Sequence, residues 1–164
     1  MHLTSTDGAL FELRPTGYQY PALNTPGDWD ANWLNVHGQV RTAAGESWTF
    51  HDPSLTTWEA HELHRWLQAA AEGRIEPTDS PGEDGEHLLA FTEPNLAFSV
   101  ASVVGEETLL RVHLSLEAVA GKPGWTAQSR PDLYEYSVPF RLDRRRLQTA
   151  AAQWSDDIAS FPPR

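Results

Sequence analysis

Apolar and polar residues alternate along several short segments of the chain, and this alternation limits the possible fold more than any other feature. Leu34, Val36 and Val40 fall on one side of an extended segment, while polar side chains fall on the other side. The same period of two returns at 108–118 and 134–141. Because successive side chains of a strand point to opposite faces, the pattern predicts half-buried strands, which are typical of antiparallel sheets.

Turn residues separate the expected strands. Asp7-Gly8 favours a tight hairpin turn, and Pro15 is expected to end the hairpin that this turn begins. Pro139 predicts an edge position for its strand, since proline cannot donate to a neighbouring strand. The predicted strands are 3–5, 10–13, 34–41, a partner carrying Trp48 and Phe50, 87–92, 96–104, 108–118 and 134–141.

Two segments show the apolar spacing of helices. Ser54 is a candidate N-cap and Gly73 a candidate C′ residue for the first helix, and Asp143 is a candidate cap for the second. The apolar stripe of the first helix is Leu55, Trp58, Leu63, Trp66, Leu67 and Ala70. The stripe of the second is Leu147, Ala150, Ala151, Trp154, Ile158 and Phe161.

These patterns together predict an α+β fold. We expect an antiparallel β-sheet of about six to eight strands with two α-helices packed on one face. The length of 164 residues, with 40% hydrophobic content, fits a single domain over 1–164. The acidic, proline- and glycine-rich segment 74–86 is expected to be an exposed loop rather than a domain linker.

The absence of cysteine excludes disulfides, thiolate nucleophiles and cysteine-based zinc sites. No stretch approaches the roughly 18 apolar residues of a membrane span, and the first residues lack the basic start and apolar run of a secretory signal. We therefore expect a cytoplasmic protein that does not enter a membrane.

The negative charge is concentrated in the middle of the chain. Residues 46–107 contain thirteen carboxylates against two arginines, which equals the whole formal net charge of -11. Such a charge repels nucleic acid and anionic membranes and speeds association with basic proteins. An acidic surface can also serve solubility alone.

No sequence motif predicts catalysis. Asp28-Trp29-Asp30 resembles the opening of a calcium loop, but Trp33 stands where the loop needs glycine, so turn hydrogen bonds are the simpler interpretation. His61 and His64 are three apart rather than four, which disfavours a shared zinc ion. We expect no enzyme activity, cofactor or metal, although a spatial pair of carboxylates could still form a hydrolytic site.

Two further features allow both functional and structural interpretations. Arg144-Arg145-Arg146 lies in the first turn of a predicted helix, where the helix dipole disfavours cations, so it either contacts an anion or forms ordinary surface salt bridges. The aromatic residues of segment 17–33 either bind a small ligand or partner, or plug the edge of the sheet. Those residues are Tyr18, Tyr20, Trp29 and Trp33.

The first 70 or so residues resemble one bacterial family. Four segments carry the resemblance: Gly17-Tyr18-Gln19-Tyr20-Pro21, Asp28-Trp29-Asp30-Ala31-Asn32-Trp33-Leu34, Trp48-Thr49-Phe50-His51-Asp52-Pro53 and Leu55-Thr56-Thr57-Trp58-Glu59. In order and spacing they are similar to the WapI family of bacterial immunity proteins. The resemblance implies a small cytoplasmic antidote that blocks a toxin domain delivered between neighbouring cells. It also implies that the toxin is a nuclease of the tRNA-cleaving kind. The matching segments contain no catalytic motif.

The resemblance supplies no contact residues, so the candidate binding surface comes from the charge pattern. A basic nuclease groove would attract an acidic partner. The candidate partner-binding residues are Asp79, Glu83, Asp84, Glu86, Glu106 and Glu107. A small-ligand-binding module that uses segment 17–33, and a hydrolase without a recognisable motif, are the alternative functions.

Overall fold

The computed structural model describes residues 1–79, 87–126, 128–129 and 131–164. The first half of the chain contains β1 (His2–Thr4), β2 (Leu10–Tyr18), a 3-10 turn η1 (Asp30–Asn32), β3 (Trp33–Arg41), β4 (Ser47–Thr56) and α1 (Thr57–Ala71). The second half contains β5 (Leu89–Ala90), β6 (Leu96–Val104), β7 (Glu107–Leu114), α2 (Glu117–Ala120), β8 (Ser137–Asp143) and α3 (Arg144–Ile158).

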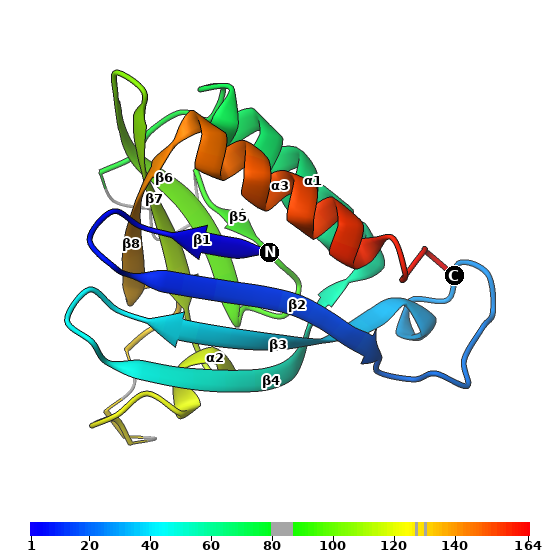
Figure 1. Ribbon diagram of the computed structural model, residues 1–164. Coiled ribbons are helices and arrows are strands. Elements are labelled where there is room, and N and C mark those ends of the chain that lie inside the picture. The colour runs from blue at the N-terminus through cyan, green and yellow to red at the C-terminus, as the bar shows by residue number, and fades with distance from the viewer. Residues whose placement is uncertain (80–86, 127, 130) are drawn as a thin grey trace.

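The eight strands form two antiparallel sheets of four strands each, in the orders β1-β2-β3-β4 and β5-β6-β7-β8 (Figure 1). The predicted α+β class, strand number and pair of long helices are therefore confirmed. α1 separates β4, the last strand of the first sheet, from β5, the first strand of the second. Phe11 of β2 packs against Phe98 of β6 and Phe140 of β8, with ring centroids 6.2 and 6.5 Å apart, so both sheets share one core.

The first hairpin forms as predicted, but β2 does not end at Pro15. Gly8 has φ +92° in the predicted turn, and β2 continues past Pro15 to Tyr18 with a register shift between Pro15 and Gly17. β1 pairs with β2 only as far as Glu12. Beyond that point one side of β2 lacks a partner strand, so a proline without an N–H is tolerated there.

The N-cap prediction for α1 was wrong, whereas the C-terminal prediction is confirmed. Ser54 is buried in β4, and α1 begins after Thr56, whose side chain and that of Glu59 form a reciprocal capping box. This box satisfies two backbone N–H groups, which Ser54 alone cannot do. At the other end Gly73 has φ +69°, and its N–H donates to Ala70 O as in a Schellman motif.

The apolar stripe of α1 is mostly buried, with Trp66 partly buried and Trp58 exposed. Leu63 and Leu67 are fully buried, and the Trp66 ring lies 5.9 Å from that of Phe98. Trp58, which the helical pattern assigned to the core, is instead 36% exposed, and it contacts Trp29 of the 19–32 loop.

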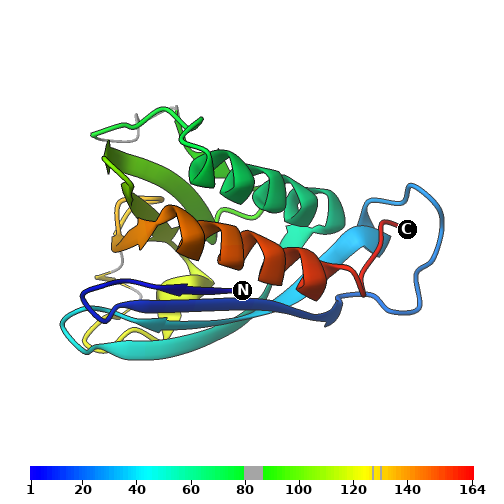
Figure 2. The same cartoon turned by 45° about the horizontal axis from the view of Figure 1, so that its top comes forward.

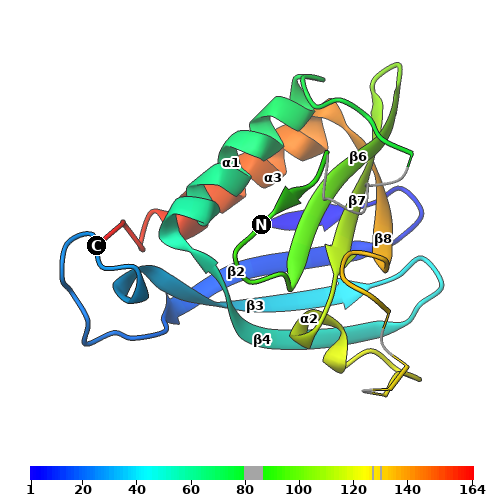
Figure 3. The ribbon, with the colours of Figure 1, turned by 180° about the vertical axis from the view of Figure 1, so that it is seen from behind.

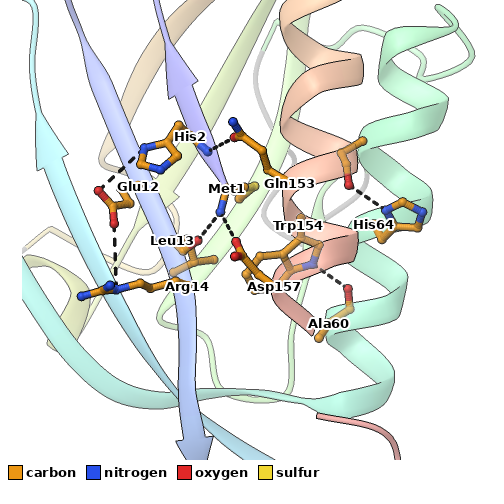
Figure 4. Close-up of polar contacts among 11 residues, drawn as sticks. Met1, His2, Glu12, Leu13, Arg14, Ala60, His64, Gln153, Trp154 and Asp157 are labelled. Carbon is orange, nitrogen blue, oxygen red and sulfur yellow. Dashed lines mark hydrogen bonds and ion pairs between the residues drawn. The ribbon is translucent and has the colours of Figure 1, made fainter. Parts of the chain in front are cut away.

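The two long helices pack side by side on the same side of the first sheet (Figure 2). Asp143 caps α3 as predicted, accepting a hydrogen bond from the Arg146 N–H. Trp154 of α3 is fully buried, and its indole N–H donates to Ala60 O of α1 at 2.8 Å (Figure 4). His64 Nδ1 lies 3.0 Å from Ala151 O, a second link between the helices.

The last strands differ from prediction at their ends. β7 stops at Leu114 rather than 118, because Leu116 adopts φ +48° and α2 follows against β4 (Figure 3). Of the expected strand 87–92, Leu89–Ala90 is extended and paired. Pro139 lies on β8, at the edge of its sheet, as predicted.

Candidate functional site

Three of the six candidate acidic residues, Glu83, Asp84 and Glu86, lie outside the described residues. Asp79 is described and exposed. Its segment runs beside β6, where the Thr78 N–H donates to Val100 O at 2.9 Å. The Arg111 guanidinium donates to the carbonyls of Thr78 and Asp79 at 2.9 and 3.0 Å. These bonds fix the backbone of Asp79 and leave its carboxylate at the surface.

Glu106 and Glu107 lie at the β6–β7 turn, where Gly105 provides the positive φ of +60°. Both glutamates are exposed. Glu107 forms an ion pair of 3.1 Å with Arg141 of β8, and the two side chains are about half exposed. Such a surface pair adds little stability, so Glu107 can exchange partners at small cost.

The C-terminal end of α1 lies next to this turn. A cavity of about 180 Å³ opens between them, and Glu72, Glu106 and Arg144 are among its lining residues. Val100, beside the Asp79 segment, and Gly105 lie about 16 Å apart at the usual strand rise. The described candidate acids therefore fit within the area of one protein interface.

Arginines from other parts of the sequence lie among these acids. Arg111 and Arg141 are brought in by sheet pairing, Arg144 by the start of α3, and Arg74 pairs with Glu72. Counting charge along the sequence missed the first three because they follow residue 107. Across the described residues, this surface is therefore mixed in charge rather than uniformly acidic.

Other carboxylates of the acidic segment have local structural roles. Glu46 pairs with Lys122 at 2.9 Å. Glu59 completes the α1 capping box and also accepts from the Thr92 N–H at 2.6 Å. The fold thus distributes the described acids of this segment over several surfaces, which a linear count cannot reveal.

One carboxylate cluster was not singled out from the sequence. The Asn95 amide donates to Asp52 at 2.7 Å, and the Ser115 N–H donates to Asn95 O, which brings Glu93 and Glu117 near Asp52. Burial, followed by the charge of Glu117, raises the pKa of Asp52. Burial, followed by the charges of Asp52 and Glu117, raises the pKa of Glu93. These residues are the structure's candidates for the pair of neighbouring carboxylates that the sequence analysis kept as a possible hydrolytic site.

The candidate metal motifs do not form a common site. His64 bonds to Ala151 O, whereas His51 lies 3.0 Å from the Thr16 hydroxyl. Asp28 accepts from the Asp30 N–H at 3.0 Å, which is the turn hydrogen bond expected for this side chain. Within the described ranges, no group of three or more His, Asp or Glu side chains has a geometry that could hold a metal ion.

The basic first turn of α3 forms ordinary surface interactions together with an open cavity. Arg146 pairs with its own helix cap, Asp143, at 3.1 Å. A cavity of about 390 Å³ between β1 and α3 is lined by both of these residues, together with His2, Arg145 and Gln153. Figure 4 shows the adjoining contact, in which the His2 N–H donates to Gln153 Oε1 at 2.9 Å.

The aromatic residues of segment 17–33 are divided between packing and exposure. Tyr18 packs edge-on against Phe161 and lies under the Arg164 guanidinium. Tyr20 and Trp29 are 44% and 51% exposed, so plugging the sheet edge does not account for them.

No described helix is both long and apolar enough to cross a membrane. No curated protein matches the chain significantly. A family model described as the Immunity protein WapI-like family matches residues 2–162. The match extends from β1 beyond α3, well past the first 70 residues that carry the resemblance in the sequence. The chain therefore belongs to the WapI-like family of immunity proteins.

Proposed function

We propose that this protein binds a basic, nuclease-type toxin domain in the cytoplasm and neutralises it, using an acidic surface. The observation that carries the proposal is the family match over residues 2–162, because immunity proteins act by binding a toxin partner. The net charge of -11 supports a basic partner, since opposite charges raise the association rate.

The proposed contact residues are Asp79, Glu106 and Glu107, together with Glu83, Asp84 and Glu86, which lie outside the described residues. The three described carboxylates are exposed and come from two segments that flank β6. A nuclease holds its phosphate backbone with basic residues, so an acidic partner can occupy the same groove. The arginines among these acids would restrict binding to a toxin surface that also carries acceptors for them.

The first experiment tests neutralisation in cells. The protein is coexpressed with the toxin domain encoded beside its gene, and growth is measured with and without the protein. We expect the wild type to restore growth. A failure to rescue, together with no detectable complex between the purified proteins, would refute the assignment for that toxin.

The second experiment tests the surface. Asp79→Lys, Glu106→Lys and Glu107→Lys are combined, and association with the toxin is measured at low and high salt. We expect association to slow about tenfold or more at low salt, with a smaller effect when salt screens the charges. The control reverses three exposed acids elsewhere, Asp132, Glu135 and Asp156, and changes the net charge equally. Equal slowing in both variants would show that overall charge matters and that this surface does not.

A hydrolytic function is the competing hypothesis, and Asp52, Glu93 and Glu117, whose charges act on one another, are its candidate residues. Raised carboxyl pKa values are what a general acid requires. A panel of ester, phosphate and glycoside substrates tests it. Turnover that is lost in Asp52→Asn would favour hydrolysis, whereas no turnover on any substrate leaves binding as the function.

A further inference from the structure

Two tryptophans lie exposed and in contact at one end of the molecule. Trp29 is 51% exposed and Trp58 is 36% exposed, with their ring centroids 5.3 Å apart and the rings inclined by 39°. Tryptophan gains more from burial than most side chains, so an exposed pair is unfavourable in a free surface. Apolar surface of this kind marks interaction sites, and tryptophan is enriched among the residues that dominate interface energies.

The pair is held in place by a buried asparagine. Asn32 is fully buried, and its side-chain oxygen accepts from the Thr57 hydroxyl at 2.7 Å. Its amide donates to Asp28 O at 2.7 Å. Asn32 therefore ties the Trp29 turn to the first residue of α1, immediately before Trp58. A surface fixed in this way loses little conformational entropy when a partner binds.

Carboxylates neighbour both tryptophans along the chain. Asp28 and Asp30 flank Trp29 in the sequence, and Glu62 follows Trp58 by one helical turn on the same face of α1. Asp30 and Glu62 are exposed. In the part of the chain that the structure describes, none of these three carboxylates forms an ion pair. Carboxylates without an ion pair thus neighbour both tryptophans, while the Arg164 guanidinium bonds to the same loop through Pro21 O and Leu23 O.

Elsewhere in the molecule, comparable aromatic groups are covered by cations of the chain itself. The Lys122 ammonium lies 4.6 Å from the Trp125 ring centroid, and the Arg164 guanidinium lies 3.4 Å from that of Tyr18. Among the described residues, no lysine or arginine covers Trp29 or Trp58. The exposed pair thus has the chemistry of a cation-binding surface without an internal cation.

We propose that Trp29 and Trp58, with Asp28, Asp30 and Glu62, form a docking surface for a basic segment of a protein partner. An arginine or lysine side chain would lie over an exposed indole face, where the ring quadrupole attracts it, and the carboxylates would neutralise its charge. Nucleic acid does not fit this surface because its phosphates would be repelled. The proposal does not depend on the surface around Asp79, Glu106 and Glu107.

The probe is a short unstructured peptide of alternating arginine and glycine, titrated into the ¹⁵N-labelled protein while the seven indole N–H signals are followed by NMR. We expect the signals of Trp29 and Trp58 to shift most. In the variant Trp29→Ala/Trp58→Ala the affinity should fall about tenfold, since two exposed cation–π contacts are lost. Leu133→Ala, which truncates a side chain that is 50% exposed elsewhere, should leave the affinity unchanged.

Both of these variants keep the net charge, so nonspecific attraction of the peptide is the same in each. A further variant, Asp30→Asn/Glu62→Gln, keeps both rings and should also weaken binding, which guards against loss of structure in the tryptophan variant. Equal affinity for wild type and Trp29→Ala/Trp58→Ala, or shifts confined to other indoles, would overturn the proposal. So would native mass spectrometry showing a small molecule that copurifies with the wild type and is lost from the tryptophan variant.

Discussion

Truncating Trp154 to alanine should destabilise the protein more than changing any exposed aromatic residue. Trp154 is fully buried between α3 and α1, and its indole N–H donates to Ala60 O at 2.8 Å. Loss of a buried tryptophan side chain costs about 3–5 kcal/mol, because the neighbouring residues only partly fill the cavity. The Ala60 carbonyl lies inside α1 and keeps its helical hydrogen bond, so the lost indole bond adds about 1 kcal/mol at most.

Urea unfolding followed by far-ultraviolet circular dichroism measures this effect. With a slope of about 2 kcal/mol per molar urea, a loss of 4 kcal/mol lowers the unfolding midpoint by about 2 M. That is a large part of the roughly 5–15 kcal/mol by which a typical domain is stable. The matched control is Trp29→Ala, which removes the same side chain from a site that is 51% exposed. The control should cost less than about 1 kcal/mol. Similar midpoints for the two variants would refute the packing argument.

Three further predictions concern pH, a partly buried ion pair and cooperativity. Burial lowers the pKa of His113 below its ordinary 6.5. As the pH falls, the unfolded chain therefore takes up a proton at this histidine before the folded protein does, and the free energy of unfolding should decrease between pH 7.5 and 5.5. The variant His113→Gln should reduce this pH dependence. The same slope of stability against pH in the variant and the wild type would contradict the prediction. Lys122 is 7% exposed and lies between Glu46 and three aromatic rings. Lys122→Ala should cost about 2 kcal/mol in thermal or urea unfolding, whereas Glu72→Gln in the exposed Glu72–Arg74 pair should cost less than about 1 kcal/mol. Because both sheets share one core, we expect a single domain with coincident unfolding curves by circular dichroism and tryptophan fluorescence; two separated transitions would contradict this.

The elements with strong local signals were predicted well. Gly73 ends α1 and Asp143 begins α3, because both signals depend on backbone groups within a few residues. The start of α1 was placed too early. Ser54 and Thr56 are both acceptable caps in sequence terms, and the choice depends on β4 pairing with β3 as far as Thr56.

The candidate site was less predictable because surface charge depends on which strands become neighbours. Arg141 reaches Glu107 through the pairing of β7 with β8. Asp52 bonds to the Asn95 amide, and Glu93 and Glu117, which are far from Asp52 in the sequence, lie near enough for their charges to affect the pKa of Asp52 or Glu93. The Trp29–Trp58 contact likewise joins a loop to a helix across about thirty residues. A pattern over neighbouring residues cannot predict contacts between residues so far apart in the sequence.

By itself, the sequence determined the antiparallel α+β class, the two amphipathic helices and the net charge, because each follows from periodicity or composition over neighbouring residues. Only the tertiary structure decided how the strands divide into two sheets, which acids acquire arginine partners and which aromatics remain exposed. Gly38 illustrates the difference: it interrupts the apolar alternation of β3, and a Cβ there would lie 2.0 Å from the Phe50 ring that covers it. The need for glycine at this position comes from the side chain on the paired strand, so it depends on the register in which the two strands pair.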